Sequence, residues 1–181
     1  MKDGIRVLGI DDASFEFESE KTFLTGVVYR GSEFIEDIQS IEVEVDGEDA
    51  TEKVLELYEE FSNHQQIKAV LTDGIAFGGF NLVDIDEVAE KIGKPVVAVT
   101  KNRPDRRGFR KAMKRTDNYD ERFEKFEEAV EVELEDGKCF IQFSGCSRKD
   151  AEGFVRKNIV HGQVPESIRV ADMVGRALNP E

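Results

Sequence analysis

The fold is decided by residues 67–100, which read IKAVLTDGIAFGGFNLVDIDEVAEKIGKPVVAVT. The apolar, β-branched start of this stretch predicts a buried strand that ends at Asp73-Gly74. A helix follows, because apolar residues recur at helical spacing until Gly93: Ile85, Val88, Ala89 and Ile92. Residues 95–100 are apolar again and predict another strand. Strand, helix and strand in this order predict a right-handed parallel crossover.

Three strands are expected before this crossover. Ile5–Ile10 is apolar and predicts a buried strand that ends at Asp11-Asp12. Residues 22–29 and 35–45 predict two more strands, and the second alternates in a way that leaves one face in water. The links between them are short, which favours an antiparallel meander. Residues 50–62 then predict a helix, opened by Asp49-Ala-Thr-Glu52 with the spacing of a capping box.

The remaining segments complete an α/β pattern. We expect a helix with Phe123 and Phe126, a hairpin of residues 130–134 and 138–143, and two C-terminal helices. The whole order predicts a ribonuclease H-like fold, a mixed sheet with three antiparallel strands followed by parallel strands and with helices on both faces. In that fold the first and fourth strands are neighbours, so residues at their ends converge. The 181 residues are expected to form a single domain over residues 1–181.

Acidic residues follow the predicted strands and precede the first helix. They are Asp11 and Asp12, Asp46 and Asp49, and Asp73. Clustered carboxylates raise one another's pKa unless they share a cation, and Mg²⁺ or Mn²⁺ prefers such oxygen ligands. The pattern therefore predicts a Mg²⁺ or Mn²⁺ site, with Asp11 and Asp73 as the main ligands and Asp49 as a weaker third. Simpler roles remain open, because Asp49 is also a good N-cap and two of the acids precede glycine in turn dipeptides.

The charge of the chain is uneven. The net charge is −14, yet residues 101–115 hold eight basic residues against one acid, a net +7 that leaves −21 on the rest. This basic stretch, with Lys101, Arg103, Arg106, Arg107 and Arg110 as candidate phosphate contacts, predicts that any nucleic acid binds there. The alternative is a solvated face that neutralises the acidic surface.

Several classes of protein are excluded. The cysteines Cys139 and Cys146 and the histidines His64 and His161 are too scattered for structural zinc. No apolar run approaches the roughly 18 residues that a membrane span needs. The N-terminus does not read as a signal peptide, so a cytoplasmic protein is expected.

Five segments together resemble a known family: Gly9-Ile-Asp-Asp-Ala13, Asp46-Gly-Glu-Asp-Ala-Thr51, Thr72-Asp-Gly-Ile-Ala-Phe-Gly-Gly-Phe-Asn81, Gly93-Lys-Pro-Val-Val97 and Pro165-Glu-Ser-Ile-Arg-Val-Ala171. They look like an uncharacterised archaeal domain-of-unknown-function family, number 99, over nearly the whole chain. That family is in turn remotely similar to endonuclease V, a metal-dependent nuclease of the ribonuclease H-like fold that acts next to deaminated purines.

The similarity to endonuclease V implies roles for particular residues. It matches Asp11 and Asp73 to metal-binding aspartates of the nuclease. Asp49 stands where the nuclease has a glutamate, and Gly145-Cys146 stands where it has Gly-His. The Pro-Tyr-Ile-Pro wedge that the nuclease inserts beside a damaged base has no counterpart, so a preference for inosine does not carry over.

The expected function is therefore a divalent-metal-dependent phosphodiesterase that acts on nucleic acid through Asp11, Asp49 and Asp73. The principal alternative is a binding module that kept the fold and the basic stretch but lost the chemistry. A third class is a nucleotide-binding protein that uses the backbone amides of the loop Gly74–Asn81.

Overall fold

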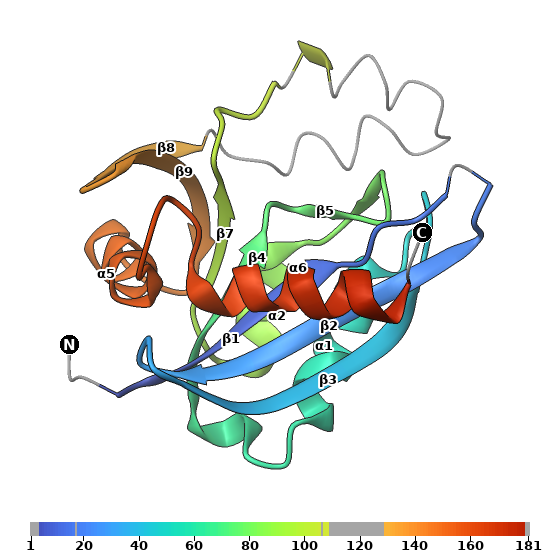
Figure 1. Ribbon diagram of the computed structural model, residues 1–181, viewed down its shortest axis with the longest axis horizontal. Helices are drawn as coiled ribbons and strands as arrows, with labels where there is room; N and C mark the ends of the chain where they lie inside the picture. Colours follow the sequence, from blue (N-terminus) through green and yellow to red (C-terminus); the bar gives the residue numbers. More distant parts are fainter. Residues whose placement is uncertain (1–3, 17, 106, 109–128, 180–181) are drawn as a thin grey trace.

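A seven-stranded sheet organises the molecule (Figure 1). The computed structural model describes residues 4–16, 18–105, 107–108 and 129–179. The strand order across the sheet is β3-β2-β1-β4-β7-β9-β8. The strands are β1 (Arg6–Asp12), β2 (Lys21–Arg30), β3 (Phe34–Glu44), β4 (Ile67–Asp73), β7 (Val96–Thr100), β8 (Val130–Leu134) and β9 (Gly137–Ser144).

The pairing of the strands confirms the predicted topology. β1, β2 and β3 form an antiparallel meander, and β1 pairs in parallel with β4, which pairs in parallel with β7. β9 pairs antiparallel with β7 and carries β8 at the edge, so the predicted hairpin extends the same sheet. The expected helix with Phe123 and Phe126 lies outside the described residues. The central position of β1 beside β4 brings the ends of these two strands together.

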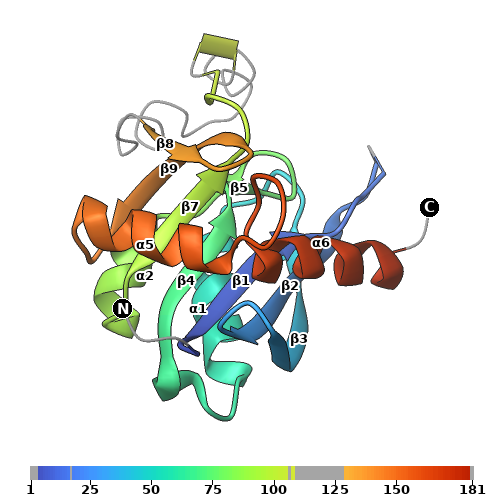
Figure 2. The same cartoon turned by 60° about the vertical axis from the view of Figure 1, so that its left-hand side comes forward.

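Helices cover both faces of the sheet, as predicted. α1 (Ala50–Glu60) and α2 (Ile85–Ile92) cover one face, and α5 (Arg148–Asn158) and α6 (Glu166–Leu178) cover the other, where Figure 2 shows them in orange and red. Between α1 and α2 lie a short 3-10 helix, His64–Gln66, and a small hairpin of β5 (Ala76–Phe77) and β6 (Asn81–Leu82). No helix among the described residues is long and apolar enough to cross a membrane.

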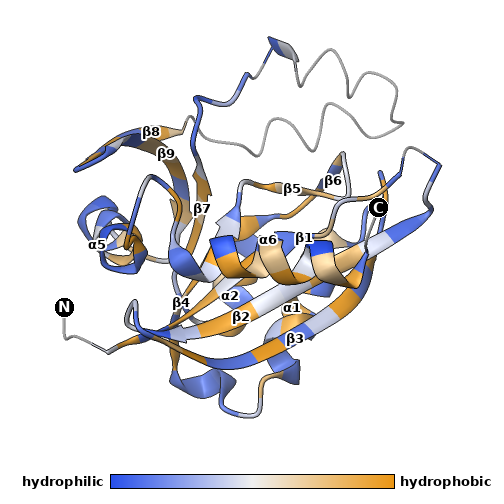
Figure 3. Cartoon of the chain, in the orientation of Figure 1, coloured by the Kyte–Doolittle hydropathy of each residue, from blue (hydrophilic) through white to orange (hydrophobic). Residues whose placement is uncertain are grey.

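The alternation of residues along β1 creates two apolar cores. Leu8 and Ile10 pack with α1 and α2, whereas Val7 packs with α5 and α6. Successive side chains on a strand point to opposite faces, so one strand supplies both cores. Figure 3 shows the apolar residues concentrated along the sheet and on the inner sides of the helices.

Helix α6 approaches β1 closely because both elements carry small residues at the crossing. A Cβ on Gly9 would lie 2.3 Å from the carbonyl carbon of Ser167, and one on Gly175 would lie 3.2 Å from Cα of Ala13. Real Cβ atoms do not approach backbone carbon to 2.3 Å, so only glycine fits at position 9. The close approach sets the start of α6 beside the middle of β1 and places Gly175 beside Ala13, just past the end of β1.

We expect Gly9→Ala to lower the free energy of unfolding by about 3 kcal/mol, because the clash with backbone forces α6 away from β1. Urea denaturation measures the change. Gly93→Ala is the control: Gly93 has φ +64° but open space around it, so this variant is expected to cost only about 1 kcal/mol. Equal costs for the two variants would contradict the steric account.

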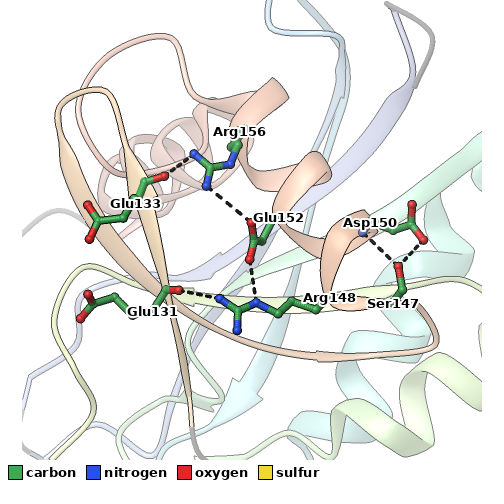
Figure 4. A network of polar contacts seen from close by, with 7 residues as sticks. All are labelled: Glu131, Glu133, Ser147, Arg148, Asp150, Glu152 and Arg156. Atoms are coloured by element: carbon green, nitrogen blue, oxygen red, sulfur yellow. Dashed lines mark hydrogen bonds and ion pairs between the residues drawn. The ribbon is translucent and has the colours of Figure 1, made fainter.

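Arginine side chains from α5 cover the edge strand β8 (Figure 4). Nη2 of Arg148 donates to the carbonyl of Glu131 at 3.2 Å, and Nη1 of Arg156 donates to the carbonyl of Glu133. Glu152 accepts from both guanidinium groups and fixes them side by side. These contacts give partners to edge carbonyls that could otherwise pair with another chain.

Candidate active site

A cavity of about 640 Å³ opens at the carboxyl ends of β1, β4 and β7. The loop before α6 and the first turns of α6 form its other wall. Its lining combines acidic and basic side chains: Asp11, Asp73, Asp105 and Asp172 with Lys101, Arg103, His161 and Arg169. Acids that attract a cation and bases that attract phosphate thus line one space.

Asp11 and Asp73 reach this cavity because of the pleat of their strands. Asp11 shares the sheet face of Val7, and Asp73 shares that of Leu71, and both apolar residues pack on the α5 and α6 side. Asp11 is only 7% exposed, whereas Asp73 is exposed. The structure therefore brings together the two strand-end aspartates that the sequence offered as the main metal ligands.

The environment strongly disfavours charge on these two carboxyls. Burial raises the pKa of Asp11 to about 9, with further contributions from the charges of Asp73 and Asp12. Partial desolvation raises the pKa of Asp73, which still contacts solvent, to about 6, with contributions from Asp12 and Asp172 and an opposing one from Lys101. A pKa of about 9 leaves the carboxyl of Asp11 protonated at neutral pH when no cation is bound. A divalent cation could take the place of that proton.

The raised pKa of Asp11 predicts a pH dependence of stability in the metal-free protein. Between the ordinary pKa of 3.8 and the native value of about 9, the unfolded chain binds fewer protons than the native state. Stability therefore falls as pH rises through this window. We expect the Tm in EDTA to fall between pH 5 and 8, and Asp11→Asn to be more stable than the parent at pH 8 by on the order of 2 kcal/mol.

Thermal unfolding monitored by circular dichroism measures this difference. Asp37→Asn on β3, at a group that lies outside the cavity, controls for the loss of one acidic residue. An Asp11→Asn variant that is less stable than the parent at pH 8 in EDTA would show that Asp11 carries a stabilising charge instead.

Asp172 on α6 is a further acid of the cavity, besides Asp11, Asp73 and Asp105, and the sequence interpretation missed it. It lines the cavity, and its charge raises the pKa of both Asp11 and Asp73. One oxygen of its carboxylate accepts from Arg176 at 2.6 Å. The sequence held one indication of this role: Asp172 directly follows Ala171, which is buried on the face of α6 that packs on the sheet.

The structure does not bring Asp49 to this cavity. Asp49 lines a different space of about 450 Å³ beside β2, β3 and α1. Its Oδ1 accepts from Nδ2 of Asn81 at 2.6 Å and from the backbone N–H of Glu44 at 3.3 Å. The predicted capping box is wrong, because the side chain of Asp49 makes no capping bond and Oδ1 of Asn81 accepts from the N–H of Ala50 instead. Asp49 therefore joins β3 to β6.

Two other acids hold the glycine-rich loop Gly74–Asn81. Oδ2 of Asp12 accepts from the N–H of Gly78 at 2.6 Å, and Oδ1 of Asp46 accepts from the N–H of Phe80 at 2.9 Å. These two amides already bind carboxylates, so they are not free to bind the phosphate of a nucleotide. Phe77, in the same loop, is fully buried.

The basic stretch begins on the wall of the cavity. Lys101 and Arg103 line it, and the guanidinium of Arg103 lies 5.2 Å from the ring centre of Phe140. Arg107 is exposed. Arg106 and Arg110 lie outside the described residues.

Gly145-Cys146 lies at the opposite end of the strands from the cavity. Ser144 at the end of β9 pairs with Val96 at the start of β7, whereas the cavity lies beyond the end of β7 at Thr100. Cys146 therefore does not reach the aspartates. The histidine of the cavity is His161, in the loop before α6, which the sequence interpretation did not select.

The donor set of the cavity fits a hard divalent cation. Asp11, Asp73 and Asp172 offer carboxylate oxygens, the ligands that Mg²⁺ and Mn²⁺ prefer, and His161 is a nitrogen donor in the same cavity. Within the described part of the chain, no three His, Cys, Asp or Glu side chains lie so that they could hold a metal ion together as they stand. The carboxylate of Asp172 is paired with Arg176.

Curated relatives of this chain are archaeal. It is 35% identical over 178 residues to the UPF0215 protein of Methanothermobacter thermautotrophicus. The matched region covers 96% of this chain and 87% of that protein. It is also 35% identical over 184 residues to the UPF0215 protein of Thermococcus gammatolerans, covering 98% and 94% of the two chains.

Solved structures agree with the fold. A protein of unknown function from Archaeoglobus fulgidus matches with a TM-score of 0.87 and 34% identity, over 97% of this chain and 99% of that one. Human ENDOV matches with a TM-score of 0.64 and 16% identity, over 97% and 84%. Endonuclease V from Ciona intestinalis, in complex with DNA that contains an inosine, matches with 0.66 and 14%, over 97% and 85%.

These matches confirm the endonuclease V-like, ribonuclease H-like fold and the archaeal resemblance, while the family number that we attached to it stays a prediction. The family model described as endonuclease dU matches residues 3–179. The chain belongs to the endonuclease dU family.

Proposed function

We propose that this protein is a divalent-metal-dependent endonuclease. The observation that carries the proposal is the convergence of Asp11 and Asp73 on a cavity that basic side chains also line, in a chain with the fold of endonuclease V. Asp11, Asp73 and Asp172 are the proposed ligands of Mg²⁺ or Mn²⁺. Asp49 is proposed to position the loop Gly74–Asn81 instead of binding the metal.

The bound cation supplies activation of a water molecule and stabilisation of the leaving oxygen in phosphodiester cleavage. The chain itself binds and orients the substrate. Lys101 and Arg103 attract the phosphate backbone to the cavity wall, and Lys101 also favours the ionised form of Asp73. His161 also lines the cavity and is the proposed group for proton exchange with the substrate.

We propose DNA that contains deoxyuridine as the substrate, on the description of the family as endonuclease dU. Endonuclease V of Ciona intestinalis binds DNA with inosine, but the wedge associated with that recognition has no counterpart in this sequence. No preference for inosine is therefore proposed. A cytoplasmic location and a single domain remain predictions from the sequence.

A cleavage assay tests the proposal. Labelled single-stranded and duplex oligonucleotides with one deoxyuridine, one inosine or neither are incubated with Mg²⁺, with Mn²⁺ or with EDTA. Metal-dependent cleavage at or beside deoxyuridine supports the proposal. Binding without cleavage under all conditions favours the non-catalytic module, for which the ion pair of Asp172 with Arg176 is the supporting observation.

The described part of the basic stretch carries a separate prediction. We expect Lys101→Glu with Arg103→Glu to weaken binding of single-stranded DNA at least about tenfold. Two phosphate contacts are lost, so the slope of log K against log salt should flatten by about 1.4. Fluorescence anisotropy across a salt series measures both quantities. Lys53→Glu with Lys91→Glu, on α1 and α2, changes the net charge equally, and an equal effect would make the stretch only a solvated face.

A further inference from the structure

An ion pair between a buried glutamate and an exposed arginine lies on the wall of the cavity, in the first turn of α6. Glu166 is the first residue of α6 and is only 7% exposed. Nε of Arg169 donates to Oε1 at 3.1 Å and to Oε2 at 3.0 Å of Glu166, and Nη2 donates to Oε2 at 2.7 Å. One edge of the guanidinium therefore engages both oxygens of a single carboxylate.

The two partners differ sharply in exposure. The side chain of Glu166 is 9% exposed, whereas that of Arg169 is 48% exposed and lines the cavity. A carboxylate with so little exposure is costly unless a cation and hydrogen bonds compensate it. The planar fork of arginine meets a carboxylate in a fixed geometry, which a lysine cannot do. The buried carboxylate of Glu166 therefore holds the exposed guanidinium of Arg169 in place.

The other edge of the guanidinium has only a weak partner. Nη1 of Arg169 lies 3.0 Å from Sδ of Met173, and a thioether is a weak acceptor. A phosphate oxygen is a far stronger acceptor and could replace it. Asp172 follows Arg169 by three residues on the same helix, so the two side chains share a face of α6. The guanidinium of Arg169 thus lies beside Asp172, one of the proposed metal ligands.

We propose that Arg169 binds a backbone phosphate of the nucleic acid next to the reacting one, and that Glu166 is the positioning residue that fixes the guanidinium for this contact. The inference rests on the function proposed above. It adds a phosphate contact on α6, opposite the contacts from Lys101 and Arg103 beyond β7. The strand would then be held from both walls of the cavity.

The charge of Glu166 makes this proposal easy to separate from simple electrostatics. Removal of an acid near a phosphate-binding surface should by charge alone tighten nucleic-acid binding. If Glu166 positions Arg169, Glu166→Gln weakens binding instead, because the guanidinium loses the carboxylate that orients it. The two accounts therefore predict opposite signs for one variant.

The experiment measures binding of a labelled single-stranded oligonucleotide with one deoxyuridine, by anisotropy in EDTA across a salt series, together with the Tm of each variant. Arg169→Gln should weaken binding about tenfold and flatten the log–log salt slope by about 0.7. Arg169→Lys keeps the charge, so it should weaken binding while it keeps the slope. Glu166→Gln should weaken binding about threefold or more. Glu87→Gln on α2 also removes an acid paired with a cation and should not weaken binding.

Each outcome has a defined meaning. An affinity of Glu166→Gln that is unchanged or tighter in a folded protein overturns the positioning role, whatever its Tm. An unchanged salt slope in a folded Arg169→Gln variant overturns the phosphate contact. Because this variant leaves Glu166 without its cation, its Tm is the check on folding, and Arg169→Lys, which keeps a cation there, tests the contact if Arg169→Gln does not fold. A parent protein that binds and cleaves DNA while both variants match it overturns this inference alone, whereas a parent that binds no DNA overturns the proposed function as well.

Discussion

Asp11→Asn and Asp73→Asn are each expected to abolish metal-dependent cleavage, with a loss of on the order of a thousandfold or more. Such a loss corresponds to about 4 kcal/mol of transition-state stabilisation. The physical reason is that these carboxylates line one cavity at the ends of β1 and β4, where desolvation and the charges of neighbouring acids disfavour their ionised forms unless a cation is bound. An amide oxygen binds a divalent cation far less strongly than a carboxylate. Single-turnover cleavage of a deoxyuridine oligonucleotide with Mn²⁺ measures the loss.

Metal-induced stabilisation provides an independent measurement for the same variants. Millimolar Mn²⁺ should raise the Tm of the parent, because the ion binds only the folded state. The shift should disappear in Asp11→Asn. Cleavage that persists within tenfold of the parent in Asp11→Asn would remove this residue from the catalytic centre.

Asp172→Asn and Asp49→Asn are expected to have very different effects. Asp172 lines the cavity and acts on the pKa of Asp11 and Asp73, so Asp172→Asn should lower cleavage on the order of a hundredfold. Asp49 lines a different cavity and binds Asn81 and Glu44, so Asp49→Asn should keep cleavage within about threefold of the parent. Its cost should be in stability, by about 1–2 kcal/mol, because the backbone N–H of Glu44 and the amide of Asn81 lose a charged acceptor.

Cleavage rates well below the Tm, and urea denaturation, separate the two effects. The comparison is matched, since each variant removes one carboxylate and keeps the size of the side chain. A greater loss of cleavage in Asp49→Asn than in Asp172→Asn would return Asp49 to the metal site and reverse our assignment.

The strands and their order could be predicted because local signals agree with the tertiary structure. β4, α2 and β7 each have the apolar pattern of their type, and Gly93 ends α2 in the left-handed conformation. Asp11 and Asp73 could be selected because the parallel pairing of β1 and β4 sets their ends side by side. Residues adjacent to regular elements are the ones that sequence periodicity can place.

The place of Asp172 in the cavity could not be found in the same way. Asp172 reaches the cavity because Gly9 and Gly175 let α6 approach β1, and this close packing between distant segments leaves no periodic signal at Asp172. Asp49 was expected to be a weaker metal ligand, but it lines a different cavity. Its position before α1 is a normal place for an N-cap, but its partner Asn81 comes from a hairpin that sequence alone does not orient.

We propose above that Asp11, Asp73 and Asp172 share one divalent cation. The most direct test is a crystal of the protein soaked in Mn²⁺, with diffraction data collected so that manganese gives anomalous signal. Our account predicts one strong anomalous peak within ligand distance, about 2.0–2.3 Å, of oxygens from Asp11 and Asp73, with Asp172 turned from Arg176 toward it. A peak beside Asp49 and Glu44, or no peak between Asp11 and Asp73 in a soaked crystal, would contradict the account.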